Sequence, residues 1–406
     1  MKIFQINCVY KDGSTGKIMY DFHASITKFG FDSYVCYGRG KRYKEKNCFR
    51  ISNDFFGKIN KFGSFLSGYL YGGALLATRR VIRIINKIKP DIVIFWCANG
   101  YFVNLYKIIS YLGSHDVKTI FVNHAEFYYT GNCGHSLECD KWKIGCGHCP
   151  IYKKEIGSIF DNTAKSWTKM FNAFHSYKKA NIAIVSTSPW TKSRAMTSPI
   201  LKDFKHVVIY NGIDTSIFRY LNVCNQTRHG FKKVVFHPTS YFQNDINSFK
   251  GGYYVVELAK KMPDVLFVVA GMTIGELPEL NNLHFVGRIS DQTVLARYYN
   301  DADLTLLVSK KETFSMITVE SLCCGTPVVG FKAGAPELIA LEEYSSFVDF
   351  GNVSELERIM SSWLLKELDK EKISNEAIGS YSKEVMTRKY IELIESLSSG
   401  DFYDGL

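Results

Sequence analysis

Short apolar runs alternate with amphipathic stretches along most of the chain. The first series of strand-like runs covers residues 2–9, 33–37, 91–96, 117–122, 182–186 and 206–209, and the second covers residues 234–238, 266–270, 284–286, 304–309 and 327–330. Helix-like stretches such as residues 253–262 and 291–299 separate these runs, and a glycine loop at residues 13–16 leads into a helix that ends near Phe29. This alternation is typical of βαβ units and a mostly parallel sheet. The pattern therefore predicts an α/β fold with two doubly wound, Rossmann-like domains.

The length of the chain supports a division into two domains. Its 406 residues exceed what one hydrophobic core usually holds together. We expect a first domain at residues 1–210 and a second at residues 211–382, with a C-terminal helix at about residues 383–406 that packs back on the first domain. Ligands of such sheets bind beyond the carboxyl ends of the strands. The expected site is therefore a central cleft that both domains face.

Composition excludes several classes of protein. With 46% hydrophobic and 22% charged residues the chain is globular, not disordered or fibrous. No apolar run is long enough to cross a bilayer, and residues 1–9 lack the features of a signal peptide. We therefore expect a cytoplasmic protein. Because thiols stay reduced there, the eleven cysteines indicate buried thiols or a metal site rather than disulfides.

The most informative stretch is SKKETFSMITVESLCCGTPVVGFKAGAPE, at residues 309–337. Glu312 falls in a predicted loop at the end of a strand, and Glu320 lies eight residues on, in a predicted helix. The loop carboxylate can accept hydrogen bonds from sugar hydroxyls, and the helix carboxylate can hold a ribose diol. The free N–H groups at the start of the helix suit a diphosphate. On spacing alone, two solvated glutamates on an ordinary helix would be the simpler explanation.

Together, the motifs resemble those of retaining GT-B glycosyltransferases of family 4. Glu312 and Glu320 fit an E-x7-E pattern, followed by GTPVV at residues 325–329 and GAPE at residues 334–337. The segment NGID at residues 211–214, with Phe218, fits the linker of that family, and residues 14–16 fit its N-terminal glycine loop. The resemblance covers nearly the whole chain. It implies that Glu312 binds the transferred sugar and Glu320 the ribose, within a donor-binding set of Gly16, Lys250, Glu312, Thr313, Phe314, Ser315 and Glu320.

Two positions depart from the pattern of the family. Ser315 stands where the family often has glycine after the phenylalanine of the loop. The family also usually has an arginine about five residues before a diphosphate-binding lysine, and here Asp245 precedes Lys250. Phosphate binding is then expected to depend on Lys250 and backbone N–H groups. The alternative for Lys250 is a solvated loop lysine.

A histidine marks the acceptor side of the expected cleft. His124 follows the strand at residues 117–122, and Glu126 lies two residues on. A lone histidine is more often structural. The resemblance, however, implies a histidine close to the transferred sugar at this position. His124 and Glu312 are therefore the candidate catalytic residues, although we do not expect His124 to be a general base, because the leaving phosphate can take that role.

Four cysteines form a separate cluster after His124. Cys133, Cys139, Cys146 and Cys149 follow the spacing C-x5-C-x6-C-x2-C, which suits a tetrahedral zinc ion. A structural zinc is one hypothesis for this segment, and a thiol-rich loop beside the acceptor is the other. Similar segments occur in some bacterial family 4 enzymes that build surface polysaccharides. That resemblance implies the class of acceptor.

Positive charge is concentrated in one segment. Residues 41–89 hold twelve Lys or Arg and two acids, which accounts for +10 of the net +11. Phe55, Ile59, Phe62, Leu66 and Tyr69 recur at the spacing of one helix face. Aromatic residues beside cations suit an anionic membrane surface, so we expect membrane contact through residues 41–89. The alternative is a core-facing amphipathic helix with a solvated basic side.

These observations predict one main function and two alternatives. The main prediction is a retaining transferase that moves a hexose-type sugar from a nucleotide diphosphate sugar to a lipid-linked or growing saccharide in surface polysaccharide synthesis. It would lie at the inner face of the membrane and need no cofactor for catalysis. The alternatives are a non-hydrolysing nucleotide-sugar epimerase of GT-B fold and a non-catalytic nucleotide-sugar-binding scaffold. Nucleic acid is not an expected partner, because no binding motif accompanies the basic segment.

Overall fold

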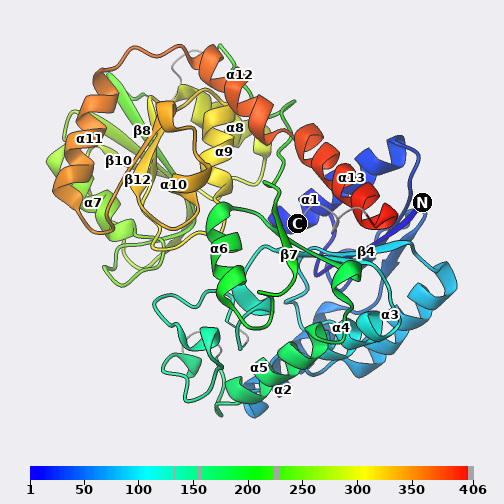
Figure 1. Ribbon diagram of the computed structural model, residues 1–406. Coiled ribbons are helices and arrows are strands. Elements are labelled where there is room, and N and C mark those ends of the chain that lie inside the picture. Colours follow the sequence, from blue (N-terminus) through cyan, green and yellow to red (C-terminus); the bar gives the residue numbers. More distant parts are fainter. Residues whose placement is uncertain (132, 154–156, 223–227, 401–406) are drawn as a thin grey trace. The chain divides into compact units, whose positions relative to one another are not determined.

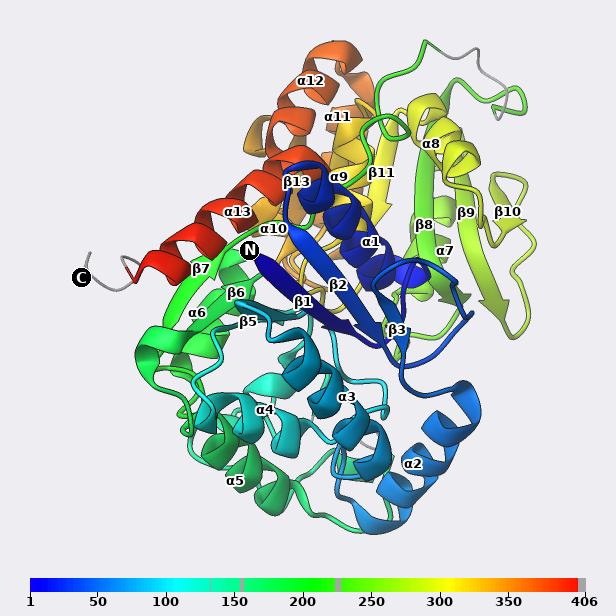
Figure 2. The ribbon, with the colours of Figure 1, turned by 90° about the vertical axis from the view of Figure 1, so that its right-hand side faces the viewer.

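The protein is built from two compact units, each with its own parallel sheet (Figures 1 and 2). The computed structural model describes residues 1–131, 133–153, 157–222 and 228–400. The first unit comprises residues 1–210 together with the C-terminal residues from Met386 onward, and the second comprises residues 211–385. The prediction of two doubly wound α/β domains is thus confirmed for the described residues. Residues 401–406 of the predicted C-terminal helix lie outside them.

The described part of the first unit forms a seven-stranded sheet in the order β3-β2-β1-β4-β5-β6-β7, and every pairing is parallel. Its strands are β1 (Lys2–Asn7), β2 (Asp32–Tyr37), β3 (Cys48–Arg50), β4 (Ile92–Phe95), β5 (Thr119–Asn123), β6 (Ile182–Ser186) and β7 (Lys205–Val208). The order reverses between the neighbouring strands β1 and β4. Ligands of doubly wound sheets bind at the carboxyl ends of the strands beside such a switch point.

Helices cover both faces of this sheet. They are α1 (Gly13–Lys28), α2 (Asp54–Ser67), α3 (Leu75–Ile88), α4 (Leu105–Ser114), α5 (Thr163–Phe174), α6 (Pro189–Thr197) and α13 (Lys383–Ser399). One face carries α1 and α13, whose Phe22 and Tyr390 rings lie 5.2 Å apart. The other face carries α3, α4 and α5. The last helix of the chain therefore completes the core of the first unit, as the two views show (Figures 1 and 2).

The start of α1 corrects one expectation. The glycine loop predicted at residues 13–16 is already helical, because α1 begins at Gly13. Gly16 lies in the first turn, and its carbonyl accepts a hydrogen bond from the Lys11 N–H at 3.1 Å. A Cβ at Gly16 would stand 3.1 Å from the Val9 side chain. Gly16 therefore allows a close approach of the β1–α1 loop to the helix, which a larger residue would permit only if the Val9 side chain shifted.

Within the described residues, the second unit repeats this plan with a six-stranded parallel sheet in the order β10-β9-β8-β11-β12-β13. Its strands are β8 (Lys233–Gln243), β9 (Val265–Ile274), β10 (Leu283–Gly287), β11 (Leu304–Leu307), β12 (Val328–Phe331) and β13 (Ser345–Val348). Its helices are α7 (Gly252–Lys261), α8 (Gln292–Asp301), α9 (Met316–Cys323), α10 (Pro336–Ile339), α11 (Val353–Leu365) and α12 (Lys370–Tyr381). The switch point lies between β8 and β11.

The two segments at the ends of the second unit are tied together. The Ile213 N–H donates to the Tyr381 carbonyl at 2.9 Å, and the Lys383 N–H donates to the Ile213 carbonyl at 2.9 Å. An ion pair of 2.8 Å joins Lys383 to Asp214. Burial alone would raise the pKa of the Asp214 carboxyl, but the hydrogen bonds from Lys383 and Ser216 lower it below its usual value. The NGID motif thus links the first residues of the second unit to its last ones.

We expect Asp214→Asn to lower the melting temperature at pH 7, because Lys383 loses its charged partner. The folded pKa of Asp214 lies below its usual value of 3.8. Its contribution to stability is therefore present above that value and is lost as the pH falls through the folded pKa. In thermal scans the difference between variant and wild type should shrink as the pH falls below 3.8. Asp349→Asn is the matched control, because its pair with Lys332 has the same 2.8 Å length but is largely exposed. Equal effects of both substitutions at pH 7 would contradict the assignment.

Candidate functional site

A lysine and a glutamate form an ion pair across the switch point of the second unit. Lys250 follows β8 and Glu312 follows β11, and these strands are neighbours in the sheet. The Lys250 Nζ donates to the Glu312 Oε1 at 2.7 Å. Both side chains are about one-fifth exposed, with 19% for Lys250 and 18% for Glu312. The structure therefore brings these two predicted residues together at the edge where ligands of such sheets bind.

The loop of Lys250 is fixed by its contact with the end of β11. The Phe249 carbonyl accepts a hydrogen bond from the Lys310 N–H at 2.9 Å. Gly251 adopts a φ of 71°, and a Cβ there would stand 2.1 Å from the Val308 carbonyl oxygen. Only glycine fits this position. The Asp245 carboxylate accepts the Asn247 N–H at 2.8 Å, so the residue at the expected arginine position shapes the turn of this loop.

The loop of Glu312 is held by the GAPE segment. The Glu312 N–H donates to the Ala333 carbonyl at 2.8 Å, and the Ala335 N–H donates to the Glu312 carbonyl at 3.2 Å. The Glu337 carboxylate in turn accepts the N–H groups of Ala333 and Gly334 at 3.0 and 2.8 Å. The glutamate of this motif therefore organises the backbone that positions Glu312.

The segment after Glu312 leads directly into α9. Thr313 is half-buried and Phe314 is buried, and Ser315 is the N-cap of the helix. Ser315 has a φ of 86°, a left-handed conformation that favours glycine. Its hydroxyl accepts the Thr318 N–H at 3.3 Å. A serine at this position therefore provides a cap at the cost of backbone strain.

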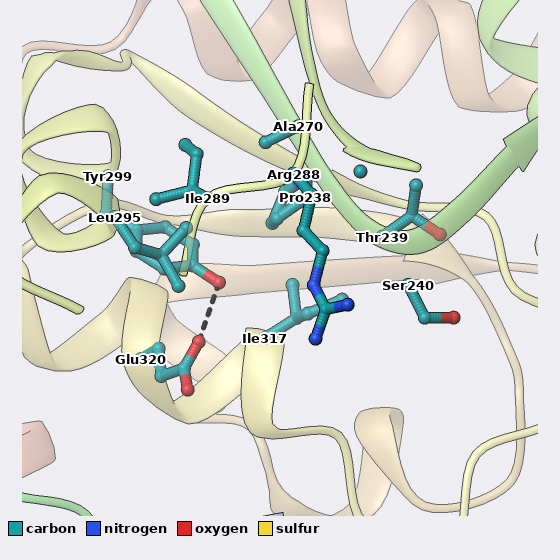
Figure 3. Close-up of a pocket in the computed structure, with 11 residues that line it drawn as sticks. Pro238, Thr239, Ser240, Ala270, Arg288, Ile289, Leu295, Tyr299, Ile317 and Glu320 are labelled. Carbon is teal, nitrogen blue, oxygen red and sulfur yellow. Dashed lines mark hydrogen bonds between the residues drawn. The ribbon is translucent and has the colours of Figure 1, made fainter. Parts of the chain in front are cut away.

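Glu320 lies at a pocket of the second unit (Figure 3). Its Oε2 accepts a hydrogen bond from the Tyr299 hydroxyl at 3.0 Å. Tyr299 is fully buried, and burial, followed by the Glu320 carboxylate, raises its pKa well above the usual value. The cavity measures about 460 Å³ and is lined by Pro238, Thr239, Ser240, Ala270, Gly271, Arg288, Ile289, Leu295, Tyr299, Ile317 and Glu320. It therefore combines an apolar wall with a carboxylate and one guanidinium.

This arrangement supports the binding of a ligand with hydroxyl and phosphate groups. Glu320 and Glu312 offer carboxylate oxygens to hydroxyls. Lys250 and the first N–H groups of α9 offer positive charge to an anion. These groups come from the carboxyl ends of neighbouring strands, which explains why residues 70 positions apart, Lys250 and Glu320, serve one edge of the sheet.

The remaining predicted site residues belong to the first unit. His124 follows β5, is half-buried, and its ring lies 6.2 Å from that of Trp96. Burial lowers the pKa of His124 to about 4, so the imidazole is neutral at pH 7. A neutral ring can still exchange hydrogen bonds with a sugar hydroxyl. Gly16 packs against the β1–α1 loop, as described above.

The four clustered cysteines lie in one loop region but do not form a metal site in this structure. Among the described residues, no group of three or more His, Cys, Asp or Glu is arranged to hold a metal ion. Burial raises the pKa of the Cys133 thiol, and the neighbouring thiols Cys146, Cys149 and Cys139 raise it further. The thiols thus lie near one another, and zinc binding stays a prediction.

A buried ion pair anchors this cysteine loop to the first unit. Glu126 is 1% exposed and accepts the Arg194 Nε–H at 2.5 Å. It also accepts the backbone N–H of Ser136, which belongs to the loop. The Arg194 guanidinium stacks on the rings of Trp142 and Trp190, each 4.9 Å away. This anchor could not be predicted from the sequence, because its members lie on three separate segments.

Of the residues that line the pocket, only Glu320 was predicted from the sequence, and two of the others carry groups that bear on its chemistry. Tyr299 is the partner of Glu320, and Arg288 is the guanidinium that lines the cavity. Arg288 lies two residues after the strand predicted at residues 284–286, and position near a strand's carboxyl end is the same feature that identified His124. No sequence feature pairs Tyr299 with Glu320, because α8 and α9 meet only through the tertiary fold.

Comparisons with known proteins relate the chain to glycosyl transferases. Residues 238–383 match the family described as Glycosyl transferases group 1. The chain is 20% identical to the putative colanic acid biosynthesis glycosyl transferase WcaC of Escherichia coli K12, over 98% of this chain and 100% of WcaC. It is 24% identical to an uncharacterized 41.2 kDa protein in the cps region of Klebsiella pneumoniae, over 61% of this chain and 70% of that protein.

Solved structures show the same fold. Sucrose-phosphate synthase from Thermosynechococcus elongatus superimposes with a TM-score of 0.67 at 13% identity, over 98% of this chain and 99% of that one. HepE of Anabaena, in complex with UDP and glucose, superimposes with a TM-score of 0.64 at 14% identity, over 98% of this chain and 100% of HepE. The fold class is therefore GT-B, as predicted.

The cysteine cluster gives a direct prediction. If Cys133, Cys139, Cys146 and Cys149 bind zinc, the purified protein should carry about one zinc ion per chain, and chelation should lower its melting temperature. Elemental analysis and thermal scans measure both quantities. Cys139→Ser should reduce the zinc content, whereas Cys48→Ser, outside the cluster, should not. Metal-free protein after purification without a chelator would contradict the hypothesis.

Proposed function

We propose that this protein is a retaining glycosyltransferase that transfers a hexose-type sugar from a nucleotide diphosphate sugar. The observation that carries the proposal is the edge of the second sheet, where Lys250 and Glu312 meet across the switch point and Glu320 lines a cavity of about 460 Å³. The family match covers this same region, residues 238–383. HepE, whose structure holds UDP and glucose, has the same fold and supports a nucleotide-sugar donor.

Each residue has a defined role in the proposed complex. The Glu320 carboxylate accepts the two hydroxyls of the ribose, and Tyr299 holds that carboxylate in place. Lys250 and the N–H groups at the start of α9 bind the diphosphate, while Glu312 accepts hydroxyls of the transferred sugar. Gly16 and the neutral His124 belong to the sugar side, and Thr313, Phe314 and Ser315 fix the loop between the two glutamates.

In the proposed reaction the bond between the anomeric carbon and the phosphate oxygen breaks, and a new bond forms from that carbon to an acceptor hydroxyl. The leaving phosphate accepts the proton of this hydroxyl, so no protein base is required. Lys250 stabilises the negative charge that develops on the diphosphate. His124 positions the sugar and stays neutral, which agrees with its lowered pKa.

The proposed acceptor is a lipid-linked or growing saccharide of a surface polysaccharide. WcaC, which carries the name of a colanic acid biosynthesis enzyme, aligns with nearly the whole chain and supports this assignment. The epimerase alternative differs in needing no acceptor, and the scaffold alternative predicts no turnover. Neither alternative requires the exposed apolar surface of the first unit described next.

We also propose that the protein binds the cytoplasmic face of an anionic membrane, and the helix α2 supports the membrane contact. Six large side chains of this helix are exposed, namely Phe55, Phe56, Ile59, Phe62, Phe65 and Leu66, whereas its buried residues are Gly57 and Ser64. The alternative of a core-facing apolar face is therefore wrong for α2. Phe55 and Phe62 are 66% and 62% exposed. Lys58 and Lys61 on α2 are also exposed, as are Arg79, Arg80, Arg83 and Lys87 on α3.

This surface would bind to one leaflet of a membrane without crossing it. Of the helices described, none is long and apolar enough to cross a bilayer. The exposed rings of α2 would enter the interface, and the basic residues would contact anionic headgroups. The surface thus combines an apolar contribution with a salt-sensitive one.

The two glutamates should have separable effects. Glu320→Ala should weaken binding of the nucleoside diphosphate, because the ribose loses its acceptor, whereas Glu312→Ala should lower turnover at least tenfold without weakening that binding. Thermal shift with UDP, GDP and ADP measures binding, and a ligand at a hundredfold its Kd stabilises by about 2.7 kcal/mol. Release of nucleoside diphosphate from the sugar donor, with a membrane extract as acceptor, measures turnover.

Glu371→Ala removes an exposed carboxylate of the same unit and serves as the control. Wild-type behaviour of both site variants would refute the site. Equal turnover with and without the membrane extract would favour the epimerase.

Liposome sedimentation tests the membrane contact. We expect binding to anionic vesicles at low salt, partial release at high salt, and little binding to neutral vesicles. Replacing Arg79, Arg80, Arg83 and Lys87 by Gln should remove the salt-sensitive part, and replacing Phe55 and Phe62 by Ser should remove the salt-resistant part. Phe29→Ser, at an equally exposed site outside α2, is the control. Sedimentation of both multiple variants at the wild-type level would exclude this surface.

A further inference from the structure

Arg288 has a side chain that enters the pocket of Glu320 from the opposite wall. It follows β10 directly, after Gly287, whose φ of 73° ends the strand. Figure 3 shows the guanidinium extending toward the side of the cavity where Ile317 and Glu320 of α9 lie. The residue is exposed, and among the described residues it has no hydrogen bond, ion pair or ring contact. Its donors are therefore available to a ligand.

Lys250, the other basic residue that the proposed function assigns to the donor, is paired with Glu312 at 2.7 Å. Of the described residues that line the cavity, Arg288 alone is basic.

The charges of the pocket restrict what can bind and in which orientation. Glu320 offers acceptors for hydroxyls and repels an anion. The walls formed by Ile289, Leu295 and Ile317 suit a flat apolar group. A ligand with a base, a diol and a phosphate therefore has one favourable arrangement. Its diol binds Glu320, and the negative charge of its phosphate is neutralised by Arg288, the basic residue of the cavity.

We propose that Arg288, together with Lys250, recognises the diphosphate of the donor nucleotide. The inference rests on the proposed function. It adds a second cation to Lys250, whereas Asp245, which stands where an arginine was expected, adds none. A guanidinium binds two phosphate oxygens with parallel hydrogen bonds, which a lysine ammonium does not reproduce. Arg288 thereby makes the pocket selective for a nucleoside diphosphate over the nucleoside alone.

Titration calorimetry with a nucleoside and its 5′-diphosphate tests this role. The probes are uridine and UDP, with the guanosine and adenosine pairs measured in parallel, against wild type, Arg288→Gln and Arg288→Lys. We expect Arg288→Gln to weaken binding of the preferred diphosphate about tenfold or more and to leave the nucleoside nearly unchanged. Arg288→Lys should recover part of the loss. Arg297→Gln removes an exposed charge from α8 beside the pocket and should change neither affinity.

The outcomes separate this inference from the function on which it rests. If wild type binds a diphosphate and Arg288→Gln binds it equally well, the role of Arg288 is wrong while the proposed function stands. An equal loss for nucleoside and diphosphate would place the guanidinium on the base instead, and would also overturn the inference. If wild type binds none of the three diphosphates, both the inference and the proposed function fail.

Discussion

The Lys250–Glu312 ion pair is the interaction on which the candidate site depends. It joins the loops that follow two neighbouring strands, β8 and β11, at the point where the order of the second sheet reverses. Each side chain is about one-fifth exposed, so removing one partner would leave the other charge poorly solvated. Contacts other than the ion pair also hold the two loops, namely the close approach of Gly251 to Val308 and the hydrogen bonds of Glu337.

This pair also has a consequence for the proposed donor. A diphosphate that binds Lys250 competes with Glu312 for the single positive charge of the ammonium group and can displace it as the main partner. The exchange would free the Glu312 carboxylate for the hydroxyls of the sugar at the same moment as the phosphates enter. Arg288 lines the cavity without a partner among the described residues, so its contact with a phosphate would need no such exchange.

Much of this arrangement was predictable from the sequence, because it depends on local patterns. The apolar runs located strands such as β1, β8 and β11, and the motif spacing placed Glu312 in a loop and Glu320 in a helix. The short strands β3 and β13 were missed, since three or four residues carry little periodicity. The helix α1 begins at Gly13, earlier than expected. The two glycines at positions 13 and 16 suggested a loop, whereas Gly16 lies in the helix and packs closely against Val9.

Other features could not be predicted because they arise only when distant segments meet. Tyr299 and Glu320 pair across two helices, and Arg194 reaches Glu126 from a segment 68 residues away. Periodicity identified the apolar face of α2 but not whether that face points to the core or to solvent. The structure buries Gly57 and Ser64 instead, so the apolar face is exposed. The cysteine spacing suggested zinc. Among the described residues, the thiols lie near one another but no group of three or more ligands is arranged to hold a metal ion.

The partner exchange at Lys250 is the central claim, and one titration tests it most directly. Wild type, Glu312→Gln and Lys250→Met are titrated with the nucleoside diphosphate that stabilises wild type most. Because Glu312 competes with the phosphates for Lys250, Glu312→Gln should bind the diphosphate several-fold more tightly than wild type. Lys250→Met should bind it more weakly. Weaker binding by Glu312→Gln than by wild type would contradict the account.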